Sequence, residues 1–545
     1  MYFRHRWLLS LTLLLLPGFA PAQNANPIPY TLSFVQVTSA TGLPALQSYC
    51  IANVSATQWL ILGGRMLGLH QFNPPPANNF LQPNTTLWSI NPTTGAALQV
   101  ADLSQLTPAV GDPLTSTNQQ CEYNPETANW YVAGGYGMSR TTNTFVTFPT
   151  IFQIPVPKLV QIANSGQTSA QMQAAVVSLL QAPGIMLTNP AMKDTGGVLS
   201  HNAAGVEFLS FGQIFDGSYN PFGSGFTQSY TQSVQPFTIT ASPFSIQPLQ
   251  PITSSDKDSP FNRRDFASTY DIDPTTKQDR FAVFGGVFHP GAIAGYDYPV
   301  YLTGAGVNVS VTPDHTVTQH FGFYQSPVIV AWDGSSVYHT FFGGIGHYFY
   351  TQTAPQQVVY NYVTQSGRND GLPFIEDIDT LIENSSGQYQ EYIAPQTVPG
   401  NMLHGAAIDF IPNLAESAKF QGIAGNVVNL STFTPGEKEL IGYIYGGVEA
   451  NYPLPCIPSH GTQATNALYQ VYLTMSPWTG QIPATQATEA VGYYTHGDPN
   501  AKTPPGVPAA PAAQAAPPSE CSTSAAPVPT KPKKKSRKKS AGAQS

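Results

Sequence analysis

The sequence predicts an all-β protein built from six repeated antiparallel units, and three observations lead to this prediction. Six apolar, aromatic-rich runs each end in a glycine doublet or a near relative of one. Turn signals precede several runs, and further β-rich segments follow them. Charged residues are only 10% of the chain, which is typical of exposed β loops rather than of a helical enzyme. Such a self-similar unit is the signature of a repeat architecture. The runs span residues 59–64 (WLILGG), 130–135 (WYVAGG), 208–213 (FLSFGQ), 281–286 (FAVFGG), 339–344 (HTFFGG) and 443–447 (YIYGG).

The first unit shows the order of strands most clearly. A β-rich stretch at residues 48–54 reaches a polar turn, and the run at 59–64 follows it. The sequences TLWSI at 86–90 and AALQV at 96–100 then flank the turn NPTTG. This order predicts four short strands that pair with their neighbours in the chain. Units of this kind repeated around an axis are the blades of a β-propeller.

At these residues the chain resembles the kelch-repeat β-propellers, in which the second strand of each blade ends in Gly-Gly and the third carries an aromatic residue before a D/N-P-x-T turn. The resemblance covers roughly residues 30 to 490 and implies a six-bladed kelch-like propeller of four-stranded antiparallel blades. Two departures stand out: the third unit has Phe211-Gly212 in place of a doublet, and several units are longer than the ~50 residues of a kelch repeat. We therefore expect long insertions. The matching doublets are Gly63/Gly64, Gly134/Gly135, Gly285/Gly286, Gly343/Gly344 and Gly446/Gly447.

The two ends of the propeller are expected to meet in one blade. The strand-like segment at residues 30–37 precedes the first unit, and we predict that it is the outermost strand of the sixth blade. That blade would take its inner strand from residues 404–410 and its third strand from 467–474. A ring closed in this way has no free edge. One helix is predicted over residues 169–181, as an insertion between the second and third blades.

The chain ends differ in composition from the body. Residues 1–22 read as a signal peptide, because basic residues precede a short apolar segment and Ala20-Pro21-Ala22 offers small residues for cleavage. The alternative, a transmembrane anchor, requires about 20 apolar residues. We expect a propeller domain at 23–497 in a secreted, periplasmic or cell-surface protein of bacterial type, with no transmembrane segment. Residues 498–545 form a Pro/Ala-rich tail with a basic cluster at 531–539, predicted to be disordered.

The basic tail contrasts with an acidic body, since the whole chain carries a net charge of −8. The tail can contact an anionic cell envelope or the propeller itself, or serve only as a solvated extension. We expect no specific nucleic-acid partner.

Four cysteines suit an oxidising compartment, and three full pairings exist among them. Cys50 and Cys121 each stand 13 residues before the first glycine of a doublet, at equivalent positions of neighbouring blades. We favour Cys50–Cys121 as a disulfide, with Cys456 paired to either one as the alternative. Cys521 lies in the tail, and no Cys-x-x-Cys suggests a metal site.

Function in a propeller is expected at the mouth of the central channel, where loops from every blade converge. At the predicted starts of the inner strands the side chains are almost all neutral donors and acceptors, which suit sugar hydroxyls or peptide backbones rather than phosphates. The alternative is that these side chains only satisfy backbone groups and channel water. The candidate ligand-binding residues are Gln47, Gln119, His201, Thr269, Gln325 and His404.

The sequence favours a non-catalytic module that binds a glycan or a protein at the cell surface, with no cofactor and no metal. His201 and His404 belong to opposed blades, so they cannot share one ion. Two alternatives stay open. One is a propeller enzyme acting on sugars, oxidase-like or mutarotase-like, with Glu122 or Asp271 as acid or base. The other is a purely structural surface protein.

Overall fold

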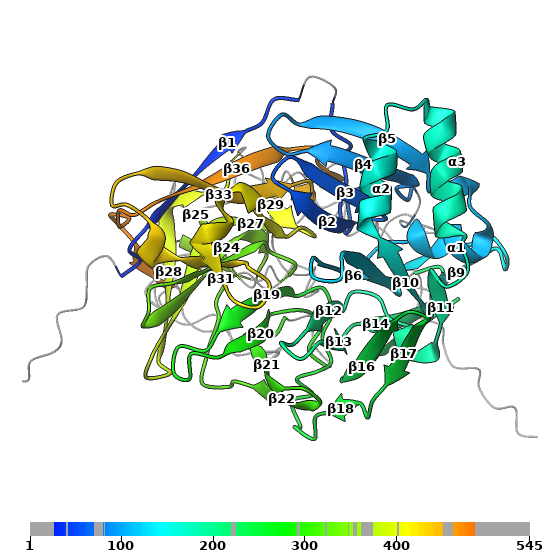
Figure 1. Cartoon of the computed structure of the whole chain (residues 1–545). Helices are drawn as coiled ribbons and strands as arrows, with labels where there is room; N and C mark the ends of the chain where they lie inside the picture. The colour runs from blue at the N-terminus through cyan, green and yellow to red at the C-terminus, as the bar shows by residue number, and fades with distance from the viewer. Residues whose placement is uncertain are drawn as a thin grey trace, which may run out of the picture.

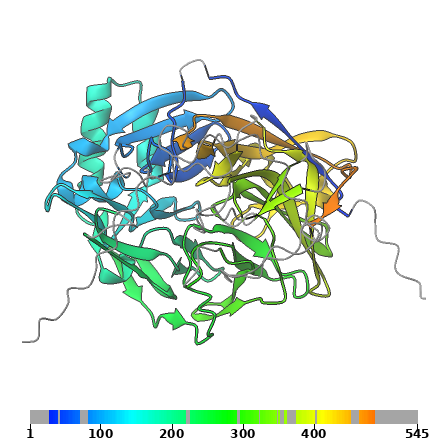
Figure 2. The same cartoon turned by 180° about the vertical axis from the view of Figure 1, so that it is seen from behind.

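The computed structural model describes residues 27–39, 42–69, 80, 82–219, 225–290, 295–321, 324–346, 348–351, 357–360, 374–399, 403–450 and 462–484. The predicted signal peptide and tail, as well as Cys456 and Cys521, lie outside these residues. The described part is almost entirely β-structure, and Figures 1 and 2 show its sheets arranged around a common centre. The fold is thus propeller-like.

The first four sheets each consist of four antiparallel strands in chain order, as predicted for the first unit. A short strand, β18 (Ile252–Thr253), adds to the third of them. The strands are, sheet by sheet, β2 (Cys50–Ser55), β3 (Gln58–Leu62), β4 (Thr86–Asn91) and β5 (Ala96–Asp102); β6 (Gln120–Asn124), β7 (Asn129–Ala133), β10 (Thr150–Pro155) and β11 (Met186–Thr188); β12 (Val198–His201), β13 (Val206–Ser210), β16 (Ser233–Ala241) and β17 (Phe244–Pro248); β19 (Ala267–Ile272), β20 (Asp279–Phe284), β21 (Val300–Ala305) and β22 (Asn308–Pro313).

The fifth sheet contains the same four-stranded meander with additions at both sides. Its core strands are β23 (Val328–Trp332), β24 (Ser336–Ile345), β27 (Phe374–Asn384) and β28 (Tyr389–Thr397). The additions are β31 (Phe420–Gln421), β32 (Val427–Asn429) and β37 (Ile482–Pro483), of which β32 runs parallel to β23.

The sixth sheet joins the two ends of the described chain. Its order is β30 (Phe410–Pro412), β33 (Lys438–Tyr445), β36 (Leu468–Thr474) and β1 (Thr31–Gln36). The antiparallel pairing of β1 with β36 agrees with the predicted role of residues 30–37. The predicted inner strand at 404–410 was placed too early, because β29 (Leu403–Ala406) belongs to another sheet and β30 begins at Phe410.

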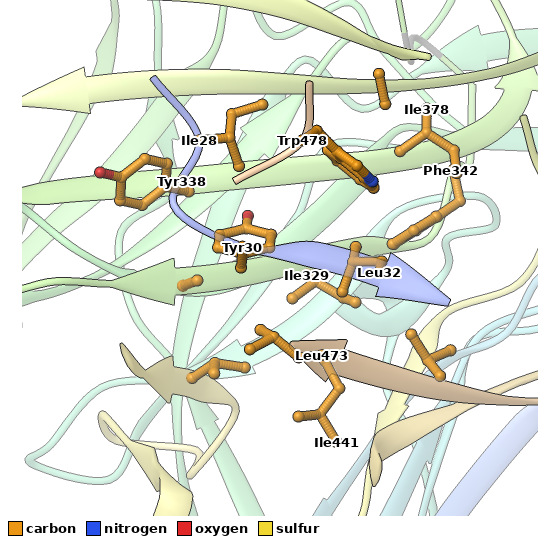
Figure 3. Packing of buried hydrophobic residues seen from close by; sticks show 14 of the residues in the cluster. Ile28, Tyr30, Leu32, Ile329, Tyr338, Phe342, Ile378, Ile441, Leu473 and Trp478 are labelled. Carbon is orange, nitrogen blue, oxygen red and sulfur yellow. The ribbon is translucent and has the colours of Figure 1, made fainter. Parts of the chain in front are cut away.

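Side chains before and within β1 anchor this closure in the largest buried cluster. Figure 3 shows Ile28, Tyr30 and Leu32 packed against residues of the fifth and sixth sheets, Ile329 and Leu473 among them. The Tyr30 hydroxyl also lies 2.7 Å from Oγ1 of Thr340 on β24. The N-terminal strand is therefore held by core packing as well as by its ladder of backbone hydrogen bonds.

Insertions make three further sheets and the helices. One sheet combines two hairpins, β8 (Tyr136–Ser139) with β9 (Thr144–Thr147) and β14 (Gln213–Gly217) with β15 (Phe226–Tyr230). The others are β25 (Tyr348–Thr351) with β26 (Gln357–Tyr360), and β29 with β34 (Val448–Ala450) and β35 (Thr462–Ala464). The helical segments are α1 (Pro108–Leu114), α2 (Val156–Ala163), α3 (Ser169–Leu180), η1 (Leu103–Gln105), η2 (Pro190–Met192), η3 (Leu414–Lys419) and η4 (Leu430–Thr432).

The predicted helix at 169–181 is α3, which begins with a capping box formed by Thr168 and Gln171. Its predicted position between two blades was wrong, because α2 and α3 lie between β10 and β11 of one sheet. Figure 1 shows both helices beside β5, and Val176 and Leu180 of α3 share a buried cluster with Val100 of β5. The helices thus bridge the first and second sheets.

The glycine doublets occupy equivalent backbone positions in all six sheets. Both residues of each pair have positive φ, between 57° and 93° for the glycines, a conformation in which Cβ is unfavourable. The third unit keeps this conformation although its first residue is Phe211, with φ 62°. The degenerate copy is therefore a full structural equivalent of the doublets.

Candidate ligand site at the channel mouth

The chain that leads into each inner strand pairs with the residue after the doublet. Five isolated antiparallel bridges repeat this pattern: Gln47 with Arg65, Thr117 with Tyr136, Thr195 with Gln213, Arg264 with Val287 and Tyr324 with Ile345. The sixth equivalent is the pairing of Ala406 with Val448. The structure thus identifies the residues at the mouth by backbone pairing.

The next residue of each segment belongs to a closed circle of backbone hydrogen bonds, which we call the mouth ring. Each N–H donates to the carbonyl of the preceding member, and the six N···O distances lie between 2.8 and 3.3 Å. All six members have positive φ, which turns each N–H towards its neighbour. The mouth ring ties the six sheets together at one level. Its members are Ser48, Asn118, Gly196, Asp265, Gln325 and Ala407.

A small cavity of about 30 Å³, bordered by open solvent, lies over the mouth ring. We call it the mouth cavity. All six ring residues line it, together with residues that directly follow doublets, such as Arg65 and Gln213. Its other walls are aromatic: Phe80, Tyr136, Phe215, Tyr219 and Tyr324.

Asp265 is the one carboxylate among the described residues of the mouth cavity, and its partners surround it. It forms a buried ion pair with Arg264. Asn118 donates to its Oδ1 at 3.0 Å, and the Tyr324 hydroxyl donates to its Oδ2 at 3.1 Å. Burial and the charge of Asp265 raise the pKa of Tyr324, so this hydroxyl stays protonated. The carboxylate is held as an acceptor and is not placed as a free acid or base.

Two arginines give the mouth cavity an excess of positive charge. Burial alone would lower the pKa of Arg264, but the charge of Asp265 outweighs it and raises the pKa well above its usual value. Arg264 Nε has no hydrogen-bond partner among the described residues. Burial lowers the pKa of Arg65 to about 10, which still leaves it charged at neutral pH, and its guanidinium lies 4.5 Å from the centre of the Phe80 ring. One negative charge therefore faces two positive ones.

Of the six predicted ligand residues, Gln47 and Gln325 line the mouth cavity. Gln47 Nε2 donates to the carbonyls of Leu67 and Gly68, so it supports the loop after the first doublet. Gln325 is a member of the mouth ring. The hydrogen bonds of Gln47 therefore favour the alternative interpretation, in which such side chains satisfy backbone groups.

The other four predicted residues are not among the lining residues. Gln119 is buried and donates from Nε2 to the Pro113 carbonyl. Thr269 lies within β19, and its Oγ1 accepts a hydrogen bond from Asn426. His201 is at the far end of β12, and His404 pairs with Glu449 in the sheet of β29. Gln119, His201 and Thr269 lie one to five residues beyond the mouth-ring members of their segments, whereas His404 lies three residues before Ala407.

The two proposed acid–base residues also lie elsewhere. Asp271 is fully buried in an ion pair with Arg280, and burial competes with the charge of Arg280, which prevails and lowers the pKa of the carboxyl. Glu122 lies on β6, near His201. Sequence reasoning missed Arg65 and Arg264, although Arg65 directly follows a doublet and so carried a usable signal.

The predicted disulfide is present. Cys50 and Cys121 are bonded, with their Cα atoms 5.8 Å apart. It links β2 to β6, the inner strands of the first two sheets, and joins positions 71 residues apart. Within the described residues, no helix has the length and apolar character needed to cross a bilayer.

Comparisons with known proteins give distant structural likenesses. No family model matches the chain, and no curated protein matches its sequence. The structure of YjhT shares 14% identity at a TM-score of 0.39, covering 78% of this chain and 99% of the other. A fungal alcohol oxidase of the AA5 family in complex with copper shares 11% identity at 0.35, over 83% and 77% of the two chains. An exo-β-1,3-galactanase from Phanerochaete chrysosporium shares 8% sequence identity at a TM-score of 0.31, covering 84% of this chain and 98% of the other. Scores of this size carry no argument about function.

Proposed function

We propose that this protein is a secreted six-bladed, kelch-like propeller that binds a saccharide over its mouth cavity without transforming it. The observation that carries the proposal is the mouth cavity itself. Its walls combine aromatic rings with amide, hydroxyl and guanidinium groups, and its floor is the mouth ring. Aromatic faces with a few fixed polar groups are typical of sites that bind small polar ligands.

The charge of the mouth cavity refines the class of saccharide. The neutral mouth expected from the sequence is replaced by two arginines and one aspartate. Two arginines and one aspartate give the described lining residues a net positive charge, which favours a ligand that carries a carboxylate. We therefore favour a saccharide that carries an acidic group, such as a uronic acid.

The carboxyl groups among the described lining residues favour binding over hydrolysis at this cavity. Glycoside hydrolysis uses two carboxyl groups about 5 to 10 Å apart. Among the described residues that line the mouth cavity, Asp265 alone carries a carboxyl group, and its oxygens accept from Arg264, Asn118 and Tyr324. A hydrolase acting at this cavity would need a second carboxyl group beyond those of the described lining residues.

A glycan array with the full chain tests the proposal. We expect binding to glycans with acidic residues and weaker binding to neutral ones. The variant Arg264→Gln removes one positive charge and leaves Arg65 and Asp265, whose charges cancel among the described lining residues. This variant should lose the preference for acidic glycans.

The matched control is Arg140→Gln, which removes an arginine that is paired with Asp112 outside the mouth cavity. It should bind as the wild type does. An undiminished preference for acidic glycans in Arg264→Gln would contradict the site, and a wild-type protein that binds no glycan on the array would contradict the function.

A further inference from the structure

Four polar side chains from three neighbouring sheets meet beside the inner strands, away from the mouth cavity. They are Glu122 on β6, His201 on β12, Glu207 on β13 and Tyr270 on β19. Glu122, His201 and Tyr270 each lie four or five residues along their segments from a member of the mouth ring. At about 3.3 Å per residue this is roughly 13 to 17 Å from the ring. The four residues make a second polar centre, separate from the first.

The side chains of this centre contact one another directly. His201 Nδ1 lies 2.7 Å from Glu122 Oε1 and 3.0 Å from the Tyr270 hydroxyl. Tyr270 donates its hydroxyl hydrogen to Glu122 Oε1, and the Tyr270 hydroxyl oxygen accepts a hydrogen bond from the His201 backbone N–H. Glu207 faces His201 across the β12–β13 pair. One ligand atom each from Glu122, His201 and Glu207 lies within 4.8 Å of the other two.

Burial makes this arrangement costly without a counter-charge. The exposed fraction of Glu207 is 4%, and the side chains of Glu122 and His201 are 10% and 15% exposed. Glu122 Oε2 and Glu207 Oε2 are both buried and have no hydrogen-bond partner among the described residues. Two neighbouring buried carboxylates must be balanced by a proton, by a protonated His201 or by a bound cation.

We propose that Glu122, His201 and Glu207 bind a divalent transition-metal ion, with Zn²⁺ as the ion that suits them best. One imidazole nitrogen and two carboxylate oxygens are a common ligand set for zinc, and three protein ligands leave a fourth position open. Imidazole disfavours Mg²⁺ and Ca²⁺, which prefer oxygen ligands alone. Two carboxylates also neutralise a charge of +2.

Small side-chain movements complete the site. Tetrahedral zinc with ligands at about 2.1 Å sets them roughly 3.4 Å apart, so the 4.8 Å span must contract by rotation of the glutamate side chains. Tyr270 would keep its hydrogen bond to Glu122 and orient that carboxylate from outside the metal, as carboxylate-orienting groups do in zinc sites. Tyr270 is thus a positioning residue.

Isothermal titration of the full chain with ZnCl₂, after removal of metals with EDTA, tests the proposal. We expect a site that Glu207→Gln and His201→Gln each weaken by at least about tenfold. The control is His320→Gln, which removes a similar buried pair, since His320 Nδ1 lies 2.6 Å from Glu391 Oε2. This control should bind zinc as the wild type does.

A second measurement guards against unfolded variants. Circular dichroism and thermal unfolding in EDTA identify the variants that are folded, and added Zn²⁺ should raise the Tm of the wild type and of His320→Gln but not of Glu207→Gln. Equal zinc affinity and equal Tm shifts in the wild type and Glu207→Gln would overturn the proposal. So would a wild-type protein with no zinc site, because the pair would then hold a proton. Neither result depends on glycan binding.

Discussion

The glycine doublets offer the sharpest test of how the sheets are joined. Gly134 has φ 63°, and a Cβ placed there would lie 2.1 Å from the Asp194 carbonyl oxygen and 2.6 Å from Gln120 Oε1. That carbonyl accepts the Gly135 N–H at 2.8 Å, so it cannot move without losing a bond between the second and third sheets. Gly166, in the loop between α2 and α3, has a similar φ of 67° but no atom within 4 Å of its Cβ position.

Alanine at the two positions separates backbone strain from close approach. Both Gly134→Ala and Gly166→Ala should pay about 1 to 2 kcal/mol for the left-handed conformation. Gly134→Ala should lower the unfolding free energy by about 1 to 3 kcal/mol more, because the added Cβ overlaps the backbone oxygen of Asp194 rather than a movable side chain. We therefore expect a total loss of about 2 to 5 kcal/mol for Gly134→Ala.

Urea denaturation followed by tryptophan fluorescence measures both free energies of unfolding. The reasoning requires that Gly134→Ala lowers the unfolding free energy by roughly 2 kcal/mol more than Gly166→Ala does. A difference below about 0.5 kcal/mol would refute the claim that the doublets are needed for close approach between sheets.

Three further predictions concern the disulfide, the N-terminal strand and a buried histidine. Replacing Cys50 and Cys121 by serine should cost about 4 kcal/mol by the chain-entropy estimate for positions 71 residues apart, measured by urea denaturation with and without reductant. Leu32→Ala should cost about 2 to 5 kcal/mol in the same assay, because the side chain is 2% exposed in the core at the closing strand. For His320, burial lowers the pKa, but the charge and hydrogen bond of Glu391 prevail and raise the pKa above 6.5. The His320–Glu391 pair therefore stabilises the fold fully below about pH 6.5, and this stabilisation is lost as the pH rises through the folded pKa. In urea unfolding, the unfolding free energy should fall by at most about 1.4 kcal/mol per pH unit in this range.

Each of these predictions has its own control. Reductant should reproduce the effect of the cysteine variant on the wild type and leave the variant unchanged. Val35→Ala, on the same strand but 43% exposed, should change the unfolding free energy by less than about 0.5 kcal/mol. If Leu32→Ala also changed it by less than about 0.5 kcal/mol, the strand would not be needed to close the fold. His320→Gln should flatten the pH dependence of the unfolding free energy above about pH 6.5, and an unchanged profile would exclude His320 as its source.

Local backbone demands explain which parts of the fold could be predicted. Consecutive positive φ values nearly require glycine, so the doublets identified the second strands of five sheets directly. In the third unit Phe211 adopts the same conformation, and packing against Phe261 and Phe266 holds it there. A pattern based on glycine alone underestimates such a unit.

The candidate site was harder to predict because backbone pairing sets its position. The starts of the inner strands were inferred from apolar residues, whereas the mouth ring consists of short polar or small residues with positive φ. Thr269 was therefore placed four residues beyond the ring member Asp265. Gln325, in contrast, is itself a member of the mouth ring.

Contacts between distant segments could not be read from the chain at all. Glu122, His201 and Tyr270 belong to three different sheets, and no local pattern relates them. The pairing of Arg264 with Asp265 is local, but its place above the mouth ring depends on all six sheets. Charge in the mouth cavity therefore emerged only from the assembled fold.

Isothermal titration of the full chain with glucuronic acid and with glucose tests the central claim, that the mouth cavity recognises an acidic saccharide, most directly. The account predicts that the wild type binds glucuronic acid at least about tenfold more tightly, a difference of about 1.4 kcal/mol, because Arg264 and Arg65 exceed the charge of Asp265. Arg264→Gln, which leaves one positive and one negative charge among the described lining residues, should remove that preference. Equal affinity of the wild type for the two sugars would contradict the account.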